Sequence, residues 1–139
     1  MIITIASPYF PYPNRGQFFG TERYTENLAF ALKEKGHEVR IITTYWNGSK
    51  KFENYNGIKI LRVQETRNLF RKRGEIFHLH FITFGLNLYR KKVFKFYSDS
   101  DVLILNFSMG LLTKFFKIKK IPIISVFHHA LLKLRDIMY

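Results

Sequence analysis

The sequence contains no cysteine, so it can form neither a disulfide framework nor a thiolate metal site, which is consistent with a reducing compartment. Long hydrophobic runs are also missing. Although 47% of the residues are hydrophobic, no uninterrupted apolar run approaches the ~18 residues that cross a membrane. The opening Met1-Ile2-Ile3 lacks the basic residues of a secretory signal. We therefore expect a cytoplasmic protein, either free or peripheral on the inner face of the membrane.

Acidic residues are scarce, because 10 Asp and Glu face 23 Lys and Arg, for a formal net charge of +13. Such a balance favours an anionic partner, namely nucleic acid, anionic lipid or phosphorylated substrates. The alternative is that the charge reflects only solubility. The sequence lacks a helix-turn-helix, a zinc finger and an RNP-type aromatic motif, so nucleic acid is the partner we expect least.

The first 44 residues of this 139-residue chain are typical of a unit that builds ligand sites in parallel α/β sheets. A strand over 2–6 leads through a proline-rich loop into a helix from Thr21 to Lys35, and a second strand follows over 38–44. Thr21 is an acceptable N-cap, and Gly36 is a natural C′ residue. Helical spacing predicts a buried stripe of Tyr24, Leu28, Ala31 and Leu32.

Three further strands are predicted over 58–63, 102–105 and 123–127, with one long helix from Glu75 to about Tyr97. Five strands with helices between them predict a three-layer, doubly wound, Rossmann-like parallel sheet of order 3-2-1-4-5. In that order the first and fourth strands are neighbours. Ligands bind beyond the carboxyl ends of such strands.

Residues after three strands then converge on one crevice: the Ser7 to Gly20 loop, Asn106 and His128. The helix that begins near Gly20 and Thr21 presents unpaired N–H groups and suits phosphate or carboxylate. The alternative is that Gly20 only permits a tight turn, because neither GxGxxG nor GxxxxGK[ST] is present. His128 is the catalytic candidate, and a structural histidine at a strand end is the competing interpretation.

Two other groups of residues were weighed as sites. His78 and His80 are two apart on a predicted helix, so they point to different sides, and no metal site is expected. Basic residues flank the aromatic region from Phe70 to Tyr97. This pattern is typical either of a helix on an anionic membrane surface or of core packing with a solvated rim.

Several segments in a fixed order make the chain similar to the family-4 glycosyltransferases. They are Ser7-Pro8-Tyr9-Phe10-Pro11, Gly20-Thr21-Glu22-Arg23, Leu28-Ala29, Leu32, Lys35-Gly36-His37-Glu38-Val39, Thr43, Asn56-Gly57-Ile58-Lys59-Ile60, Asp101-Val102-Leu103 and Pro122-Ile123-Ile124-Ser125-Val126-Phe127-His128. The resemblance covers most of the chain.

The resemblance implies the N-terminal, acceptor-side half of a GT-B fold. It also implies transfer of a sugar from a nucleotide-sugar donor, with retention at the anomeric carbon and without a required metal or other cofactor. Gly20 falls on the family's glycine loop near substrate phosphate, His128 falls on the histidine that contacts the donor sugar, and Tyr9 borders the acceptor. Thr21 and Asn106 complete the expected substrate-binding set.

Three departures from the family pattern qualify this expectation. Phe19 stands where the family has the first of two glycines, and Asn106 replaces part of a histidine-rich strand end. The donor-binding second domain would have to follow Tyr139. We therefore expect residues 1–139 to form a single, incomplete acceptor-side domain. It would need a donor-domain partner to transfer sugar to a lipid-linked or other anionic acceptor. The alternative is a basic module that binds nucleic acid or a membrane surface without catalysis.

Overall fold

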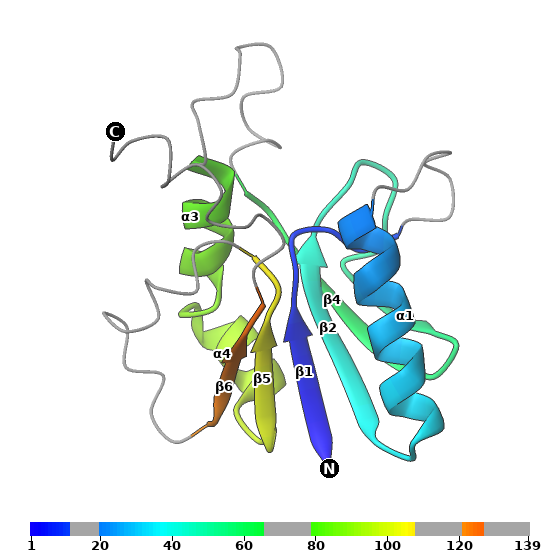
Figure 1. The fold of residues 1–139 in the computed structure, drawn as a ribbon. Helices are drawn as coiled ribbons and strands as arrows, with labels where there is room; N and C mark the ends of the chain where they lie inside the picture. Colours follow the sequence, from blue (N-terminus) through cyan, green and yellow to red (C-terminus); the bar gives the residue numbers. More distant parts are fainter. Residues whose placement is uncertain (12–19, 66–78, 108–120, 127–139) are drawn as a thin grey trace, which may run out of the picture.

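The computed structural model describes residues 1–11, 20–65, 79–107 and 121–126, which form an α/β domain around a six-stranded sheet (Figure 1). The strand order is β3-β4-β2-β1-β5-β6. The predicted order of five parallel strands is confirmed, and a sixth strand adds one edge. The elements are β1 (Ile2–Ala6), α1 (Gly20–Glu34), β2 (Glu38–Thr44), β3 (Phe52–Tyr55), β4 (Ile58–Val63), α3 (Leu79–Asn87), α4 (Lys91–Tyr97), β5 (Val102–Leu105) and β6 (Ile123–Ser125).

The edge strand β3 was not predicted, and it pairs antiparallel with β4 through a two-residue hairpin. Tyr55 lies opposite Ile58, and the two residues between them have positive φ, 49° at Asn56 and 81° at Gly57. An Asn-Gly pair suits such a turn because both residues tolerate this conformation. The other four pairings are parallel, so β4, β2, β1, β5 and β6 end at one edge of the sheet.

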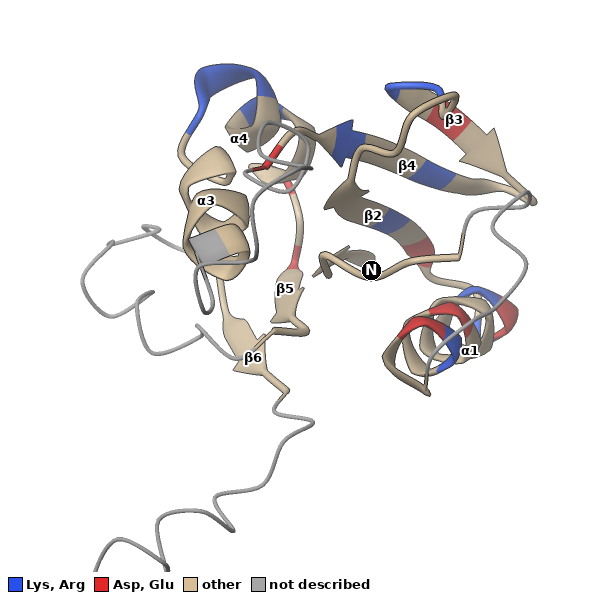
Figure 2. Cartoon of the chain, turned by 90° about the horizontal axis from the view of Figure 1, so that it is seen from above, with Lys and Arg blue, Asp and Glu red and all other residues tan. Residues whose placement is uncertain are grey.

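Helices lie on both faces of the sheet, as expected for a buried parallel sheet (Figure 2). Successive strand residues point to opposite faces, so each strand supplies two cores. Ile5, Ile41 and Ile60 pack with Ala29 of α1. The core on the other face is formed by strand residues and by residues of α3, of α4 and of the break between them. It contains Ala6, Ile42, Val63, Leu105, Phe84, Leu88, Val93 and Tyr97. This arrangement confirms the three-layer, Rossmann-like prediction.

Helix α1 begins one residue earlier than predicted, at Gly20, so Thr21 lies in the first turn and is not the N-cap. Its other end was predicted at Lys35 and lies at Glu34, and the predicted role of Gly36 as the C′ residue is confirmed. Gly36 has φ 85°, its N–H donates to Lys33 O at 2.9 Å, and the His37 N–H donates to Leu32 O at 3.2 Å. These two bonds form a Schellman C-cap.

The buried face of α1 differs from the predicted stripe, because Glu22, Thr25 and Ala29 are its buried residues. Tyr24 is 40% exposed and Ala31 is also exposed, whereas Leu28 and Leu32 pack at the margin of the core. The helix faces the sheet with a polar residue, Thr25, at its centre. A prediction from hydrophobic spacing does not count a polar residue as buried. The predicted stripe is therefore rotated about the helix axis relative to the buried face.

The predicted long helix is interrupted, since α3 ends at Asn87 and α4 begins at Lys91. Arg90 is extended (φ −67°, ψ 130°), which a continuous helix does not allow. Two side chains bond to the backbone at the break. Asn87 donates to Gln64 O at 2.6 Å, and the Tyr97 hydroxyl donates to Leu88 O at 2.8 Å. Hydrogen bonds from side chains to backbone oxygens therefore hold the break, in place of the backbone hydrogen bonds of a continuous helix. Residues 75–78 lie outside the described part of the chain.

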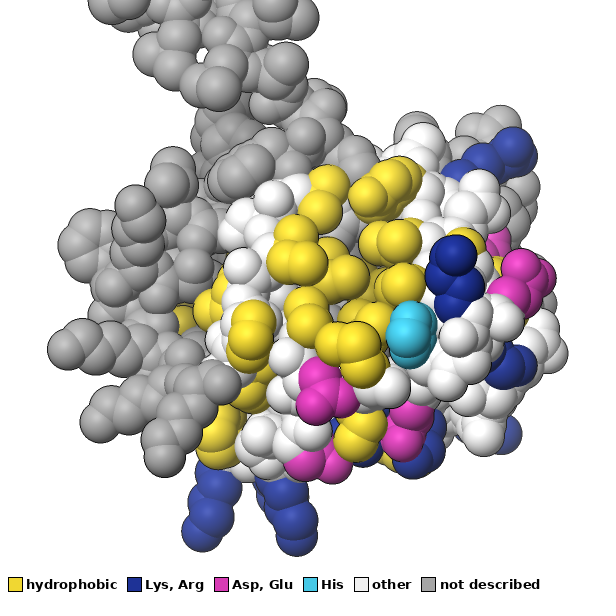
Figure 3. All heavy atoms as spheres, turned by 60° about the horizontal axis from the view of Figure 1, so that its bottom comes forward, with side chains coloured by type: hydrophobic (Ala, Val, Ile, Leu, Met, Phe, Trp, Pro, Cys, Tyr) yellow, Lys and Arg dark blue, Asp and Glu magenta, His cyan; other side chains and the backbone are white. Residues whose placement is uncertain are grey.

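Apolar side chains remain accessible beside α1, where Figure 3 shows them gathered on one face with charged side chains at the rim. Ile124 of β6 lies opposite Ile104 of β5 in the register, yet Ile124 is 52% exposed while Ile104 is 8% exposed. Within the described ranges, no helix is long and apolar enough to cross a membrane.

Ion pairs fasten the opposite, amino edge of the sheet around Arg40 of β2. The Arg40 guanidinium donates to both oxygens of Asp99, at 2.6 and 3.1 Å, to Glu38 at 3.0 Å and to Phe96 O at 2.8 Å. Its hydrogen bond holds the pKa of the Asp99 carboxyl below its ordinary value. Hydrogen bonds from Lys59 and then Arg40 do the same for the pKa of Glu38. These acids therefore join structural elements, at the edge opposite the one where ligands of parallel sheets bind.

The Arg40 cluster predicts a loss of stability in acid. Because the folded-state pKa of Asp99 is lowered, its contribution is complete above the unfolded value, near 3.8, and is lost as the pH falls through the folded value. We expect the urea midpoint of the wild type to fall below about pH 4. Asp99→Asn should flatten this fall, whereas Glu34→Gln, at an exposed α1 position, should not. Equal pH profiles for Asp99→Asn and the wild type would contradict this assignment.

Candidate functional site

A network of buried polar side chains joins the carboxyl ends of β1 and β5 to the first turns of α1. The Thr25 hydroxyl donates to Thr21 O at 2.8 Å and accepts from the Asn106 amide at 2.7 Å. It also lies 3.2 Å from the Ser7 hydroxyl. Ser7, Thr25 and Asn106 are all fully buried. Because buried polar groups are costly unless bonded, this network fixes the start of α1 against the two central strands.

The loop after β1 continues the network toward α3. The Ser7 hydroxyl donates to Tyr9 O at 2.9 Å, and the Tyr9 hydroxyl lies 3.1 Å from His80 Nε2. Tyr9 also packs edge-on against Phe81. His80 is 8% exposed, and the sequence pattern, which argues only against a metal-ligand role for it, does not indicate this contact. No local signal links it to Tyr9, since the two are 71 positions apart.

The start of α1 lies at the same edge, and its N-terminal N–H groups carry about half a positive charge. A Cβ added at Gly20 would meet nothing within 4 Å, and its φ is not positive. Neither packing nor backbone conformation among the described residues therefore requires glycine here. The residues before Gly20 lie outside the described part of the chain, so both interpretations of Gly20, a tight turn and close approach of a ligand to the backbone, stay predictions.

Four of the five predicted site residues, Tyr9, Gly20, Thr21 and Asn106, are described, and all four lie at the carboxyl edge of the sheet. Hydrogen bonds through Thr25 connect Asn106 to Thr21. Asn106 is fully buried, so its described role is to position α1, and its contact with a substrate stays a prediction. The fifth residue, His128, lies outside the described residues, and its catalytic role stays a prediction.

A family model for glycosyltransferase family 4 matches residues 19–138, which is most of the chain. The chain belongs to glycosyltransferase family 4. The Rossmann-like sheet is consistent with one half of a GT-B fold, and membership supports a glycosyltransferase-type function with nucleotide-sugar and acceptor substrates in general. A search of the curated proteins found no match.

The described part of this family-4 chain contains no group of three or more His, Cys, Asp or Glu placed to hold a metal ion. Charged groups of both signs lie near the carboxyl edge: the acids Glu22, in the first turn of α1, and Glu65, after β4, are buried, and basic residues line a pocket beside β4. The polar network is buried, and it holds the exposed start of α1 at the centre of this edge.

Because the Thr25 hydroxyl is central to the network, we expect its removal to lower the free energy of unfolding. Thr25→Val keeps the shape but leaves the Asn106 amide without its acceptor, which should lower the free energy of unfolding by about 1–3 kcal/mol. Thr43→Val is the matched control, because Thr43 is also buried but its hydroxyl has no hydrogen-bond partner among the described residues. We expect Thr43→Val to be neutral or stabilising in urea titrations. Equal costs for the two variants would show that the network contributes nothing specific.

Proposed function

We propose that this domain is the acceptor side of a retaining glycosyltransferase, which moves a sugar from a nucleotide-sugar donor to a lipid-linked or other anionic acceptor. The observation that supports this most is the location of the network of Ser7, Thr25 and Asn106. It lies where the strand order reverses, at the carboxyl ends of the adjacent strands β1 and β5. Ligands of open parallel sheets bind at this switch point.

In the proposed reaction, the bond between the anomeric carbon and the donor phosphate breaks, and a bond to an acceptor hydroxyl oxygen forms. The nucleoside diphosphate departs with the bonding electrons and takes up the proton of the acceptor hydroxyl. The helix N-terminus at Gly20 and Thr21 suits a phosphate oxygen. Tyr9 borders the acceptor, and His128 contacts the donor sugar. Asn106 and Thr25 hold the helix start in place.

The proposal assigns the other wall of the site to a second domain. A nucleotide sugar must be shielded from water and oriented against its acceptor, which one open sheet edge does not achieve. We propose that a donor-binding domain supplies this closure and that no metal ion is required. The large positive charge suits an anionic acceptor, and attraction to an anionic membrane would bring the domain close to a lipid-linked one.

A reconstitution assay tests this function. The chain, alone and with a donor-domain protein, is incubated with UDP-glucose, UDP-N-acetylglucosamine or GDP-mannose and an extract of anionic lipids. Radiolabelled sugar in the lipid fraction is then measured. We expect transfer only when both proteins are present. Failure of every combination, together with polynucleotide binding that weakens steeply with salt, would overturn the proposal in favour of a nucleic-acid module.

Gly20→Ala tests whether substrate approaches the backbone at the start of α1. Since a Cβ has open space there and alanine favours helix, the melting temperature should stay the same or rise. Transfer in the reconstituted assay should fall by about tenfold or more if a phosphate contacts this turn, the equivalent of one charge-assisted hydrogen bond. Gly85→Ala is the control, because it adds the same methyl group to α3 at ordinary contact distance from Phe107. Unchanged transfer by Gly20→Ala would remove Gly20 from the site.

A further inference from the structure

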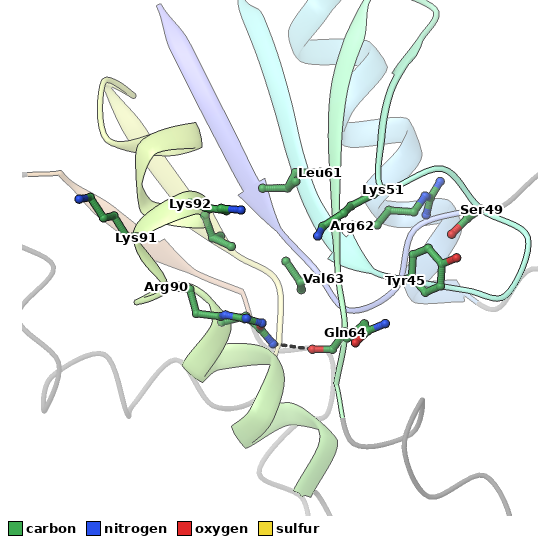
Figure 4. Close-up of a pocket in the computed structure, with 12 residues that line it drawn as sticks. Tyr45, Ser49, Lys51, Leu61, Arg62, Val63, Gln64, Arg90, Lys91 and Lys92 are labelled. Atoms are coloured by element: carbon green, nitrogen blue, oxygen red, sulfur yellow. Dashed lines mark hydrogen bonds between the residues drawn. The ribbon is translucent and has the colours of Figure 1, made fainter.

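A second feature of the carboxyl edge is a pocket of about 640 Å³ between β4 and the break that separates α3 from α4 (Figure 4). Leu61 and Val63 of β4 form its apolar floor. Lys51, just before β3, forms one wall, and Arg90 and Lys92 at the α3–α4 break form the opposite wall. We call this hollow, lined by Lys51, Leu61, Val63, Arg90 and Lys92, the basic pocket. Its size is that of a small-molecule site.

The walls of the basic pocket are held by specific bonds. The Asn87 amide donates to Gln64 O at 2.6 Å, which ties the end of α3 to the residue after β4. Asn87 Oδ1 accepts from the Arg90 guanidinium at 3.2 Å, and Asn87 itself is 6% exposed. The break therefore comes from a built contact between helix and strand. It places Arg90 and Lys92 across from Lys51 instead of along a continuous helix.

The charge of the basic pocket is uncompensated within the described part of the chain. Three of its five defining residues, Lys51, Arg90 and Lys92, are basic, and none of the twelve residues around the hollow is acidic. Arg62 is paired with Glu53 at 2.5 Å, and its guanidinium points away from the floor in Figure 4. Lys51 and Lys92 make no ion pair with any described residue, and Figure 4 shows both ammonium groups directed into the pocket. Cations converging on one hollow repel each other unless an anion joins them.

We propose that the basic pocket binds the phosphate ester of the acceptor, a phosphorylated sugar or polyol, either free or as a lipid headgroup. This assignment rests on the proposed function for the role of acceptor, but the binding itself does not depend on it. Lysine holds phosphate as a point charge and arginine holds it through a planar fork. The apolar floor of Leu61 and Val63 leaves room for a carbon skeleton beside the phosphate. The adjacent exposed Gln64 offers an amide to hydroxyl groups.

The geometry favours a phosphate ester over a flat membrane surface as the ligand. A membrane is attracted by outward-facing cations, such as Lys91, which points away from the pocket. Lys51 and Lys92 instead point inward from separate elements, which suits one compact anion. The pocket also shares the carboxyl edge with the Ser7, Thr25 and Asn106 network, because β4 is parallel to β2 and β2 to β1.

Direct binding tests this proposal without requiring sugar transfer. The whole chain is titrated with glucose 6-phosphate and with glucose by isothermal calorimetry, and with phosphatidylglycerol and phosphatidylcholine vesicles by sedimentation. The pocket variant is Lys51→Gln with Lys92→Gln. The control is Lys35→Gln with Lys95→Gln, which removes the same charge from exposed positions outside the pocket. Melting temperatures verify that both variants fold.

We expect glucose 6-phosphate or phosphatidylglycerol to bind, and we expect glucose and phosphatidylcholine not to bind. The pocket variant should weaken binding about tenfold or more, whereas the control variant should change it little. If the pocket variant weakens binding of glucose 6-phosphate, the ligand is a free ester. If it weakens binding of the phosphatidylglycerol vesicles alone, the ligand is a lipid headgroup. Equal weakening in both variants would overturn the proposal, since net charge alone would explain it. Binding that neither variant affects, or no binding of any probe, would overturn it too. Binding of a phosphate ester without sugar transfer in the reconstituted assay would support the binding role of the pocket and would contradict the proposed function.

Discussion

The Thr25 hydroxyl is the interaction on which the rest of the site depends. It accepts a hydrogen bond from the Asn106 amide, donates one to Thr21 O and lies 3.2 Å from the Ser7 hydroxyl. One buried oxygen therefore connects the ends of β5 and β1 to α1. A helix that covers a parallel sheet is usually located by apolar packing, which tolerates small shifts. A buried hydrogen-bonded network is less tolerant, because each displaced group loses its partner in a low-dielectric interior. The network therefore fixes both the angle and the register of the α1 start.

The two edges of the sheet carry opposite kinds of polar structure. At the amino edge, Arg40, Glu38 and Asp99 neutralise each other and fasten β2 to the segment that leads into β5. At the carboxyl edge, the basic pocket has cations from separate elements and no acid in its lining. Compensated charge serves the fold, and uncompensated charge in a hollow favours a ligand. This contrast is the basis of our proposal that part of the formal +13 serves a phosphorylated ligand.

The strand order, and with it the edge at which the candidate site residues lie, was predictable from sequence, because apolar runs, turn residues and right-handed crossovers leave few arrangements. The misses have physical reasons. Asn56-Gly57 is a strong hairpin signal, yet the short strand Phe52–Tyr55 before it has little apolar alternation. Thr25 occupies a core-facing position that hydrophobic spacing cannot recognise. The α3–α4 break depends on Asn87 reaching Gln64 O and on the Tyr97 hydroxyl, which are contacts between segments that no local pattern encodes. Likewise, the contact of Tyr9 with His80 joins distant parts of the chain.

Amide hydrogen exchange in the Asn106→Ala variant tests the central claim most directly, which is that Asn106 holds the start of α1 through Thr25. We expect faster exchange in the segment from Gly20 to Glu26, with the hairpin of β3 and β4 unchanged, because the hairpin shares no bond with Asn106 among those described. Unchanged exchange at the α1 start, or equal acceleration throughout the sheet, would contradict it. Either result would mean that apolar packing alone places this helix.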